Sequence, residues 1–575
     1  MNLGREYKRG LARDEWLAAA GVAAVTLLTY ASTFTFGWVY DDVPQISQNP
    51  NLTWSQTGYL FAHHLWAGLA VGEARFYRPL LMLWFVANKT LFGLNPHWFH
   101  VTTVLAHVAA TVLSFFVARE LLKSPEAALV AAAIFGLHPL QAETASWISS
   151  VNDSLAAVLC FCSFLAYRRA ARGERQRAIW WALAGMAFIP ALLIKEVSVV
   201  LAGVVLIDIW AGSSDEPQLG GFGLRLRTAA GMYGGVAVVW FAFRSWILGS
   251  AQGSSSVPWS TVVLSAPKIV LFEFYRMILP VGLSPHYDFR PVESVDAQFL
   301  IAFVALLGAI ALAIILAKRE RILAVALSWL LLPLLPSLNL RWMNEDDFIH
   351  DRYSYISILG IALIFGAGYA WMRKKWPQAQ LVRPLTAALA LILAFASATQ
   401  SQYWANDVSL FGRGVSIAPE NEWAQLNYGA ALSGRGKYAD AAPHFVRSYE
   451  LKPGWRAADF AGFSYQQSGD FVQAEHWFQT AVQQDTSQAT AWFGLGQIAL
   501  AQHQSGQAIE FLEKAIALQP EAEGYHYELG RALEQASRPD EAVEAYAKEL
   551  QLHPYQNAAR QAVARLQNTN LPASR

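Results

Sequence analysis

Two adjacent carboxylates stand where the first apolar segment of the chain ends. Asp41 and Asp42 directly follow the aromatic-rich residues 34–40. One acid of such a pair can act as a general base while the other holds it, a substrate hydroxyl or a metal ion. Adjacent carboxylates also raise each other's proton affinity, which suits a base that works near neutral pH. The alternative is a solvated turn, because Asp and Pro are common turn residues and Pro44 follows the pair.

Two cationic positions are candidates for binding a phosphate. Arg78 stands immediately before Pro79 at the start of an apolar stretch, where its guanidinium would bind a phosphate through paired hydrogen bonds, or a lipid headgroup. Lys195 and Glu196 separate two apolar segments with almost no loop between them. Either they form an ion pair in a tight hairpin, or the lysine faces a cavity and stabilises a departing phosphate.

Two further segments place polar side chains beside apolar ones. In residues 339–356, His350 and Arg352 are anion-binding candidates, whereas residues 345–347 are more simply a solvated acidic patch. An ionisable group at bilayer depth costs roughly 2.5–3.5 kcal/mol, so function is the default explanation where it occurs.

Residues 135–154 form the second segment in which polar side chains stand beside apolar ones. His138 precedes Pro139, which indicates a kink that lines a cavity, and Glu143 follows shortly after. Asn152 or Asp153 is interpreted as the cap of the next helix, because both residue types favour that position.

The composition indicates a membrane protein. Of the 575 residues, 54% are hydrophobic, 15% are charged and 22 are Trp, whereas soluble domains carry about 25% charged residues and Trp anchors helices at membrane interfaces. The 43 basic and 43 acidic residues balance, so no global field favours nucleic acid. Cys160 and Cys162 lie inside an apolar segment and predict neither a disulfide framework nor a metal site. Residues 219–227 are glycine-rich but lack the strand and lysine of a nucleotide-binding loop.

Hydropathy predicts about eleven membrane-spanning helices. Two other apolar stretches, 79–94 and 261–281, are interrupted by polar residues and are expected to lie along the interface. The predicted spans are 16–36, 97–118, 126–142, 152–168, 178–194, 197–211, 228–247, 298–317, 321–338, 354–372 and 382–400.

The distribution of basic residues predicts the orientation of these helices. With a cytoplasmic amino terminus, the basic clusters at 168–177, 318–321 and 373–375 all fall on the cytoplasmic side. If 261–281 crossed the bilayer, the last two clusters would lie outside. The candidate polar loops and the carboxyl-terminal part of the chain are therefore expected on the exterior face.

The carboxyl-terminal part contains internal repeats. Gly429, Gly462, Gly496 and Gly530 recur at intervals of 33, 34 and 34 residues, which is the period of the tetratricopeptide repeat. We therefore predict an all-α chain. Its expected parts are a transmembrane domain at 1–400, a linker helix at 401–420 and a solenoid of about four repeats at 421–575. Solenoids expose a concave surface that binds a peptide or protein; the alternative is a spacer or a dimerisation arm.

The order of these motifs resembles a known family. "YDD", "FYRPLL", "FGLHPLQAETASWISSVNDSLAA", "IKEVSV" and "HDRYSYI", followed by the repeats, resemble the transmembrane and tetratricopeptide-repeat O-mannosyltransferases and their bacterial relatives. These are GT-C glycosyltransferases, and the resemblance covers nearly the whole chain. It implies transfer of a sugar, such as mannose, from a polyprenyl-phosphate donor to a hydroxyl, with inversion. The expected acceptors are Ser or Thr residues of exported proteins, presented by the repeats.

The resemblance also implies roles for the candidate residues. Asp41 would be the base and Asp42 its acidic companion. The donor phosphate would be bound by Arg78, Lys195, His350 and Arg352, and the cavity would be lined by His138, Glu143, Glu196 and Tyr353. No divalent metal or other cofactor is favoured, because the chain has no D-x-D spacing among these acids.

Location and alternatives follow from the same observations. The Ala-rich composition with 2 cysteines suggests a bacterial inner membrane, with the repeats in the periplasm. The expected partners are the polyprenyl-linked sugar, membrane lipid and a protein acceptor, and no nucleic acid. One alternative acceptor is a lipid or cell-envelope glycan. The other alternative is a membrane-anchored scaffold without catalysis, in which the acids are merely structural.

Overall fold

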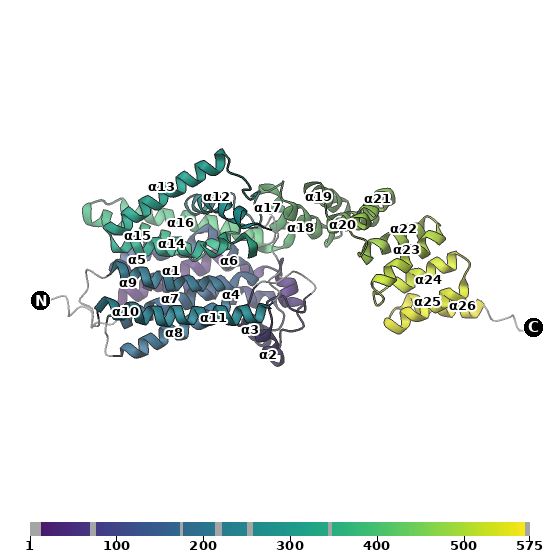
Figure 1. Ribbon diagram of the computed structural model, residues 1–575, viewed down its shortest axis with the longest axis horizontal. Helices are drawn as coiled ribbons and strands as arrows, with labels where there is room; N and C mark the ends of the chain where they lie inside the picture. The colour runs from purple at the N-terminus through teal and green to yellow at the C-terminus, as the bar shows by residue number, and fades with distance from the viewer. Residues whose placement is uncertain are drawn as a thin grey trace, which may run out of the picture. The chain divides into compact units, whose positions relative to one another are not determined.

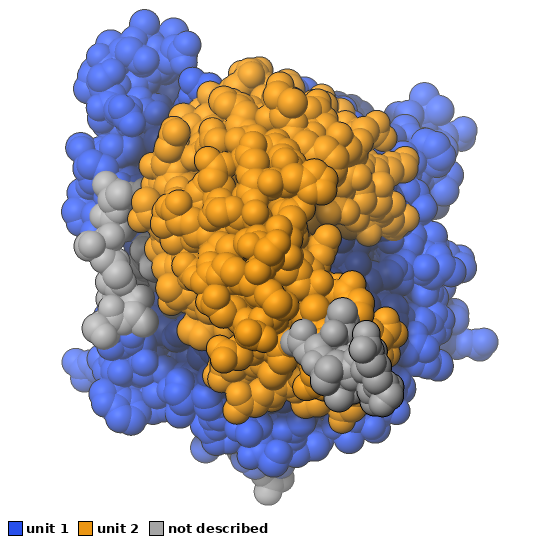
Figure 2. Space-filling view, turned by 90° about the vertical axis from the view of Figure 1, so that its right-hand side faces the viewer, with its two compact units in different colours: residues 1–413 blue, residues 414–575 orange. Residues whose placement is uncertain are grey.

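The computed structural model describes residues 13–69, 76–172, 176–212, 221–249, 257–342 and 348–569. Every regular element in these ranges is helical, so the predicted all-α fold class is confirmed. The chain divides into two compact units, Met1–Arg413 and Gly414–Arg575, shown in separate colours in Figure 2. The division falls inside the 401–420 segment that the sequence predicts to be a linker. The acidic patch at 345–347 lies outside the described residues.

The first unit is a bundle of long helices (Figure 1). Its helices are α1 (Arg13–Tyr30), α2 (Thr57–Ala62), α3 (Pro79–Phe92), α4 (Pro96–Leu122), α5 (Pro125–Leu137), α6 (Ala142–Ser146), α7 (Val151–Ala171), α8 (Arg177–Ile194), α9 (Leu201–Ala211), α10 (Gly221–Ala229), α11 (Gly235–Leu248), α12 (Trp259–Ile278), α13 (Ala297–Arg319), α14 (Arg321–Leu331), α15 (Ser357–Lys375), α16 (Val382–Ser401) and α17 (Asp407–Ile417), the last of which crosses into the second unit. Helix α4 packs against both α5 and α7, and α15 packs against α5 and α14.

Eight helical stretches of the described residues are long and apolar enough to cross a membrane. They are Arg13–Thr35, Pro96–Leu122, Ile148–Ala171, Arg177–Ile194, Phe222–Leu248, Ala297–Arg319, Arg321–Leu338 and Val382–Ala405. Each of the eleven predicted spans coincides with a helix, but α5 and α9 have 13 and 11 residues, fewer than the roughly 20 of a straight crossing. The number of crossings and their orientation stay predictions.

Local sequence explains where several helices begin. Pro96 opens α4, and the side chain of Asn95 accepts a hydrogen bond from the backbone N of His97 at 3.1 Å. Ser124 caps α5 in the same way, accepting from the backbone N of Ala127 at 3.3 Å. Such caps satisfy backbone N–H groups that have no partner within the helix. The polar ends of these helices are therefore set locally, before any packing.

Close approach of α15 to α14 requires a glycine, which gives a prediction with a matched control. A Cβ on Gly360 would lie 2.5 Å from both the carbonyl O of Ala326 and the backbone N of Leu330, whereas a Cβ on Gly368 of the same helix meets nothing within 4 Å. We expect Gly360→Ala to destabilise the protein by about 1–3 kcal/mol through overpacking. Gly368→Ala should be neutral or stabilising by roughly 0.5–1 kcal/mol. Thermal unfolding in detergent measures both; equal midpoints for the two variants would contradict the close approach.

The second unit stacks helix pairs. It contains α18 (Glu422–Ser433), α19 (Tyr438–Leu451), α20 (Trp455–Ser468), α21 (Phe471–Gln484), α22 (Ala489–Ala501), α23 (Ser505–Leu518), α24 (Tyr525–Gln535), α25 (Pro539–Leu552) and α26 (Asn557–Thr569). The four repeat glycines occupy the first helix of each pair, where a Cβ would lie within 3 Å of a side chain on the second helix. Those side chains are Phe445, Phe478, Leu512 and Tyr546. The repeat period therefore comes from one contact that recurs within each helix pair.

Candidate active site

The first unit holds a cavity of about 110 Å³ where several helix ends and loops meet. Its walls combine charged groups with aromatic and proline side chains, as small-molecule sites do. The lining residues are Asp41, Gln45, Leu65, Trp66, Phe76, Arg78, Trp147, Ser149, Ser150, Asn152, Asp153, Lys195, Glu196, Val197, Pro333, Pro336, Ser337, Arg352 and Tyr353. Six of the ten residues that the sequence analysis proposes are therefore brought together here, from segments far apart in the chain.

An anchored turn at Tyr40 leads into the two adjacent acids, whose side chains lie in different places. Tyr40 has φ 51°, the left-handed region that non-glycine residues rarely adopt. Its backbone N donates to Oδ1 of Asp407 at 2.9 Å, and its ring stacks on Trp147 with centroids 5.6 Å apart. From this anchored turn Asp41 reaches the cavity wall, whereas Asp42 lies outside it.

Asp42 instead fastens the first loop to the interior. Its Oδ1 accepts from the backbone N of Ser149 at 2.8 Å and from Ser149 Oγ at 2.6 Å, and its Oδ2 accepts from the backbone N of Val39 at 3.2 Å. Burial raises the pKa of Asp42 to about 7, although these hydrogen bonds act in the opposite direction. The alternative of two solvated turn residues therefore does not fit, since Asp42 is fully buried.

Two cations of the cavity are paired with carboxylates of other elements. The guanidinium of Arg78 binds Glu196 through Nε–Oε2 at 3.0 Å and Nη2–Oε1 at 2.5 Å. Lys195 Nζ lies 2.6 and 2.5 Å from the two oxygens of Asp153 on α7. The neighbours Lys195 and Glu196 thus each pair across the cavity, and a local hairpin ion pair does not account for them.

The ion pairs also shift the acidity of the paired groups. Burial opposes ionisation of Glu196, but the charge and hydrogen bonds of Arg78 outweigh it and lower the pKa of Glu196 to about 2. Burial lowers the pKa of Lys195, and the Asp153 carboxylate opposes this. Because both partners are held in place, the cations are positioned before any ligand arrives.

Arg352 is the third cation on the wall and follows the same pattern. Its backbone N donates to Oε2 of Glu143 at 3.2 Å, and its guanidinium also donates to that carboxylate. The guanidinium carbon lies 4.9 Å from the ring centroid of Trp147 and 5.2 Å from that of Tyr353. Burial opposes the charge of Arg352, yet Glu143 raises its pKa above the ordinary value.

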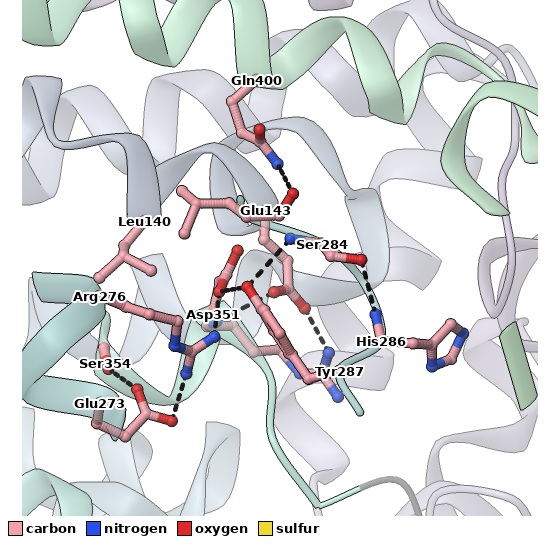
Figure 3. A network of polar contacts seen from close by, with 12 residues as sticks. Leu140, Glu143, Glu273, Arg276, Ser284, His286, Tyr287, Asp351, Ser354 and Gln400 are labelled. Atoms are coloured by element: carbon pink, nitrogen blue, oxygen red, sulfur yellow. Dashed lines mark hydrogen bonds and ion pairs between the residues drawn. The ribbon is translucent and has the colours of Figure 1, made fainter. Parts of the chain in front are cut away.

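A buried polar network holds the segment that carries Arg352 (Figure 3). Arg276 on α12 forms ion pairs with Asp351 and with Glu273, the latter at 2.5 Å between Nη2 and Oε1. The hydroxyl of Tyr287 donates to Oδ1 of Asp351 at 2.6 Å, and Ser354 Oγ donates to Oε2 of Glu273 at 2.5 Å. The residues on both sides of Arg352 are therefore anchored.

This network also explains an apparent interruption in the sequence. Glu273 and Arg276 break the apolar stretch 261–281, and each is 1% exposed. They are interior partners of the 348–355 segment, not groups that mark a membrane surface.

Three residues of the predicted set lie behind the cavity wall. His138 Nε2 contacts the carbonyl O of Met277 at 3.0 Å, and Nδ1 accepts from the backbone N of Leu140 at 3.3 Å. Glu143 reaches the cavity only through Arg352, and the buried ring of His350 packs edge-on against Tyr353 with centroids 5.2 Å apart. This placement differs from the expected lining by His138 and Glu143, because structural partners hold both side chains. It also differs from a direct phosphate contact by His350.

Among the described residues, no group of three or more His, Cys, Asp or Glu side chains is placed to hold a metal ion. Metal dependence of the chain stays a matter for experiment.

Comparison with known proteins gives matches for both parts of the chain. The family model described as Tetratricopeptide repeat matches residues 461–523 and 499–557. Human Protein O-mannosyl-transferase TMTC1 is 25% identical over 501 residues, covering 76% of this chain and 55% of the relative. Human Protein O-mannosyl-transferase TMTC4 is 24% identical over 483 residues, covering 74% and 65%. The predicted resemblance to this family is confirmed. The chain spans about half to two thirds of the length of these relatives.

Two solved structures are similar to part of the chain. A crystal structure of MamA protein is 22% identical and covers 28% of this chain and 87% of its own, with a TM-score of 0.25. The crystal structure of YrrB, described as a TPR protein with an unusual peptide-binding site, is 13% identical and covers 34% and 96%, with a TM-score of 0.26.

The cavity includes residues that the sequence-based predictions missed. Asp153 was interpreted as a helix cap, yet the N-cap of α7 is Ser150, which makes no side-chain cap hydrogen bond. Asp153 lines the cavity and pairs with Lys195. The available signal was its place in a polar segment beside apolar ones, but nothing in that segment shows which cation it meets. Trp147 was missed as well, although it contacts both Tyr40 and Arg352.

Proposed function

We propose that this protein transfers a hexose, such as mannose, from a polyprenyl-phosphate donor to a Ser or Thr hydroxyl of a protein, with inversion at the anomeric carbon. The observation that carries the proposal is the cavity, in which the carboxylate of Asp41 shares the walls with three cations held by carboxylates. The relatives are named protein O-mannosyl-transferases, which supports the reaction class.

The chemistry assigns a role to each side of the cavity. Asp41 takes the proton from the acceptor hydroxyl as its oxygen attacks the anomeric carbon. The bond from that carbon to the phosphate oxygen breaks, and the electron pair leaves with the lipid phosphate. Arg78, Lys195 and Arg352 stabilise the charge that develops on this leaving group, and fixed cations do so without reorganising during the step.

The three cations of the cavity are each paired with a carboxylate, and such a site is suited to a donor of low charge. Each cation keeps a partner when the site is empty, which avoids leaving a buried charge uncompensated. A phosphodiester then needs only to share the outward N–H groups of Arg78, Lys195 and Arg352. We expect the aromatic side chains of Trp66 and Trp147, which line the same cavity, to exclude water around the sugar.

The membrane unit and the repeats would serve one reaction. A lipid-linked phosphate lies at headgroup level, so a site at helix ends suits a donor that stays in the membrane. The basic clusters predict that this face is exterior, which in a bacterial inner membrane is the periplasm. The repeats would present the protein acceptor.

A transfer assay on the purified full-length protein tests this function. With radiolabelled mannosyl-phosphoryl polyprenol and a set of Ser/Thr-rich peptides, we expect label to appear on peptide. Removal of residues 414–575, which form their own compact unit, should lower transfer to protein roughly tenfold or more, as expected when a solenoid binds the acceptor. Transfer to lipid or glycan acceptors that survives this deletion would instead support an envelope-glycan enzyme. No transfer to any acceptor by the full-length chain would favour the scaffold alternative.

A further inference from the structure

A second cavity lies at the opposite ends of the helices that bear the active-site segment. Helix α15 begins just after the segment of Arg352 and ends at Lys375, and its 19 residues span about 28 Å. Near its far end, a groove of about 390 Å³ opens between α5, α15 and α16, helices that contact one another in the bundle (Figure 1). It is lined by Glu126, Leu129, Val130, Ala133, Ile134, Phe365, Tyr369, Met372, Arg383, Thr386, Ala387, Leu389 and Ala390.

The walls of this groove are apolar and outward-facing. Helix α16 is mostly apolar, and only 6% of the most apolar 18-residue stretch of Val382–Ala405 is buried inside the protein. Phe365 and Leu129, which line the groove from α15 and α5, are 52% and 37% exposed. In a membrane such a groove is surrounded by acyl chains, and an acyl chain is the occupant whose polarity matches its walls.

One end of the groove is polar and carries an excess of positive charge. Glu126 accepts from Arg383 Nη2 at 2.5 Å and from the hydroxyl of Tyr369 at 2.8 Å, and Arg373 Nε lies 3.9 Å from the same carboxylate. Two guanidiniums thus share one carboxylate. Lys374 and Lys375 follow directly in the last turn of α15, so two more cations stand at the same end of this helix.

Aromatic side chains place this polar end at the level of the lipid headgroups. Lys375 Nζ lies 4.8 Å from the ring centroids of both Trp371 and Trp376, and the two tryptophans are 55% and 48% exposed. Exposed Trp beside Lys is typical of a membrane interface. The groove therefore runs from headgroup level into the hydrocarbon region.

We propose that this groove binds an anionic phospholipid, with an acyl chain along the apolar walls and the headgroup phosphate on Arg373 and Arg383. Guanidinium groups bind phosphate oxygens through paired hydrogen bonds, and basic pockets between membrane helices on the cytoplasmic side bind anionic headgroups. An anionic lipid is favoured over a zwitterionic one because the headgroup of the latter brings a cation into a cluster that is already positive. The inference does not depend on the proposed transfer reaction.

Lipid retention by the purified full-length protein tests the charged end. After delipidation, the protein is equilibrated with equal amounts of phosphatidylglycerol and phosphatidylcholine of the same acyl chains, and bound lipid is counted by native mass spectrometry. We expect phosphatidylglycerol to be preferred roughly fivefold or more, and the double variant R373Q/R383Q to remove this preference. The control is K318Q/R319Q, which removes two cations from the end of α13, outside the groove.

A variant that fills the groove tests the apolar walls. Ala390→Trp keeps every charge but places a large side chain where the acyl chain would lie, so phosphatidylglycerol retention should fall as far as in R373Q/R383Q. The proposal would be overturned if the unmodified protein bound the two lipids equally. It would also be overturned if K318Q/R319Q lost as much phosphatidylglycerol as R373Q/R383Q, because the effect would then be a general attraction to the charged surface. Unchanged retention in Ala390→Trp would overturn it as well. Thermal unfolding of each variant confirms that the bundle is intact.

Discussion

Replacing Asp41 by Asn is expected to lower kcat of sugar transfer by a factor of about 10²–10⁴, the usual contribution of a positioned general base. The amide has nearly the shape of the carboxylate but cannot accept the acceptor's proton. KM for the polyprenyl-phosphate donor should change little, because Arg78, Lys195 and Arg352 supply the phosphate contacts. Steady-state transfer to a peptide, with donor binding measured separately, gives both quantities.

Asp296→Asn is the matched control for this substitution. Asp296 caps α13 by accepting from the backbone N of Phe299 at 2.7 Å, and Asn caps a helix about as well as Asp. The control should keep full activity. Wild-type kcat in Asp41→Asn would remove Asp41 as the base, whereas an unchanged kcat with a strongly raised donor KM would assign it to binding.

Replacing Arg276 by Gln is expected to destabilise the protein by about 3–5 kcal/mol, the cost of removing one partner from a buried ion pair. Glu273 and Asp351 would remain in the interior, 1% and 3% exposed, without the guanidinium between them. The segment that carries Arg352 would lose its anchor at Asp351, so donor KM should rise too. Thermal unfolding in detergent and donor titration measure the two effects.

The pH dependence of this destabilisation has a definite sign. Burial raises the pKa of Asp351 to about 7, and Arg276 opposes that rise. Without Arg276 the folded-state pKa lies still further above the unfolded value of about 4. A carboxyl with a raised folded-state pKa does not destabilise the protein at a pH where it is protonated in both the folded and the unfolded state. Its destabilising effect reaches its full size only above the folded-state pKa. The loss of stability in Arg276→Gln should therefore be smaller at pH 5 than at pH 8.

Lys268→Gln on the same helix is the control for Arg276. Lys268 Nζ contacts the ring of Phe289 at 4.6 Å and the carbonyl O of Arg290 at 3.3 Å, so its removal leaves no buried carboxylate uncompensated. We expect a change within about 0.5 kcal/mol, as for other surface substitutions. Equal unfolding midpoints for Arg276→Gln and Lys268→Gln at pH 8 would contradict a stabilising role of the buried network.

The sequence by itself determined the helices and the repeats. Apolar runs of the right length predict the helices of the first unit because hydrophobicity is a property of each segment alone. The period of 34 residues is visible for a similar reason, since Gly462 on one helix receives Phe478 of the next and both lie within one repeat. The predicted topology placed the loops of Arg78, Lys195 and Arg352 on one face, and the family resemblance assigned them, together with His350, to one phosphate site.

Only the tertiary structure decided which charges meet. Lys195 pairs with Asp153, 42 residues away, and not with its neighbour Glu196, whose partner Arg78 is 118 residues away. It also gave the two adjacent acids different surroundings, since Asp41 lines the cavity whereas Asp42 is held in the interior by Ser149, 107 residues away. The partners of an ion pair are decided by the packing that brings particular helix ends together. Once the pair is buried, exchanging a partner is energetically costly. The spacing of residues in the sequence shows neither the packing nor the burial.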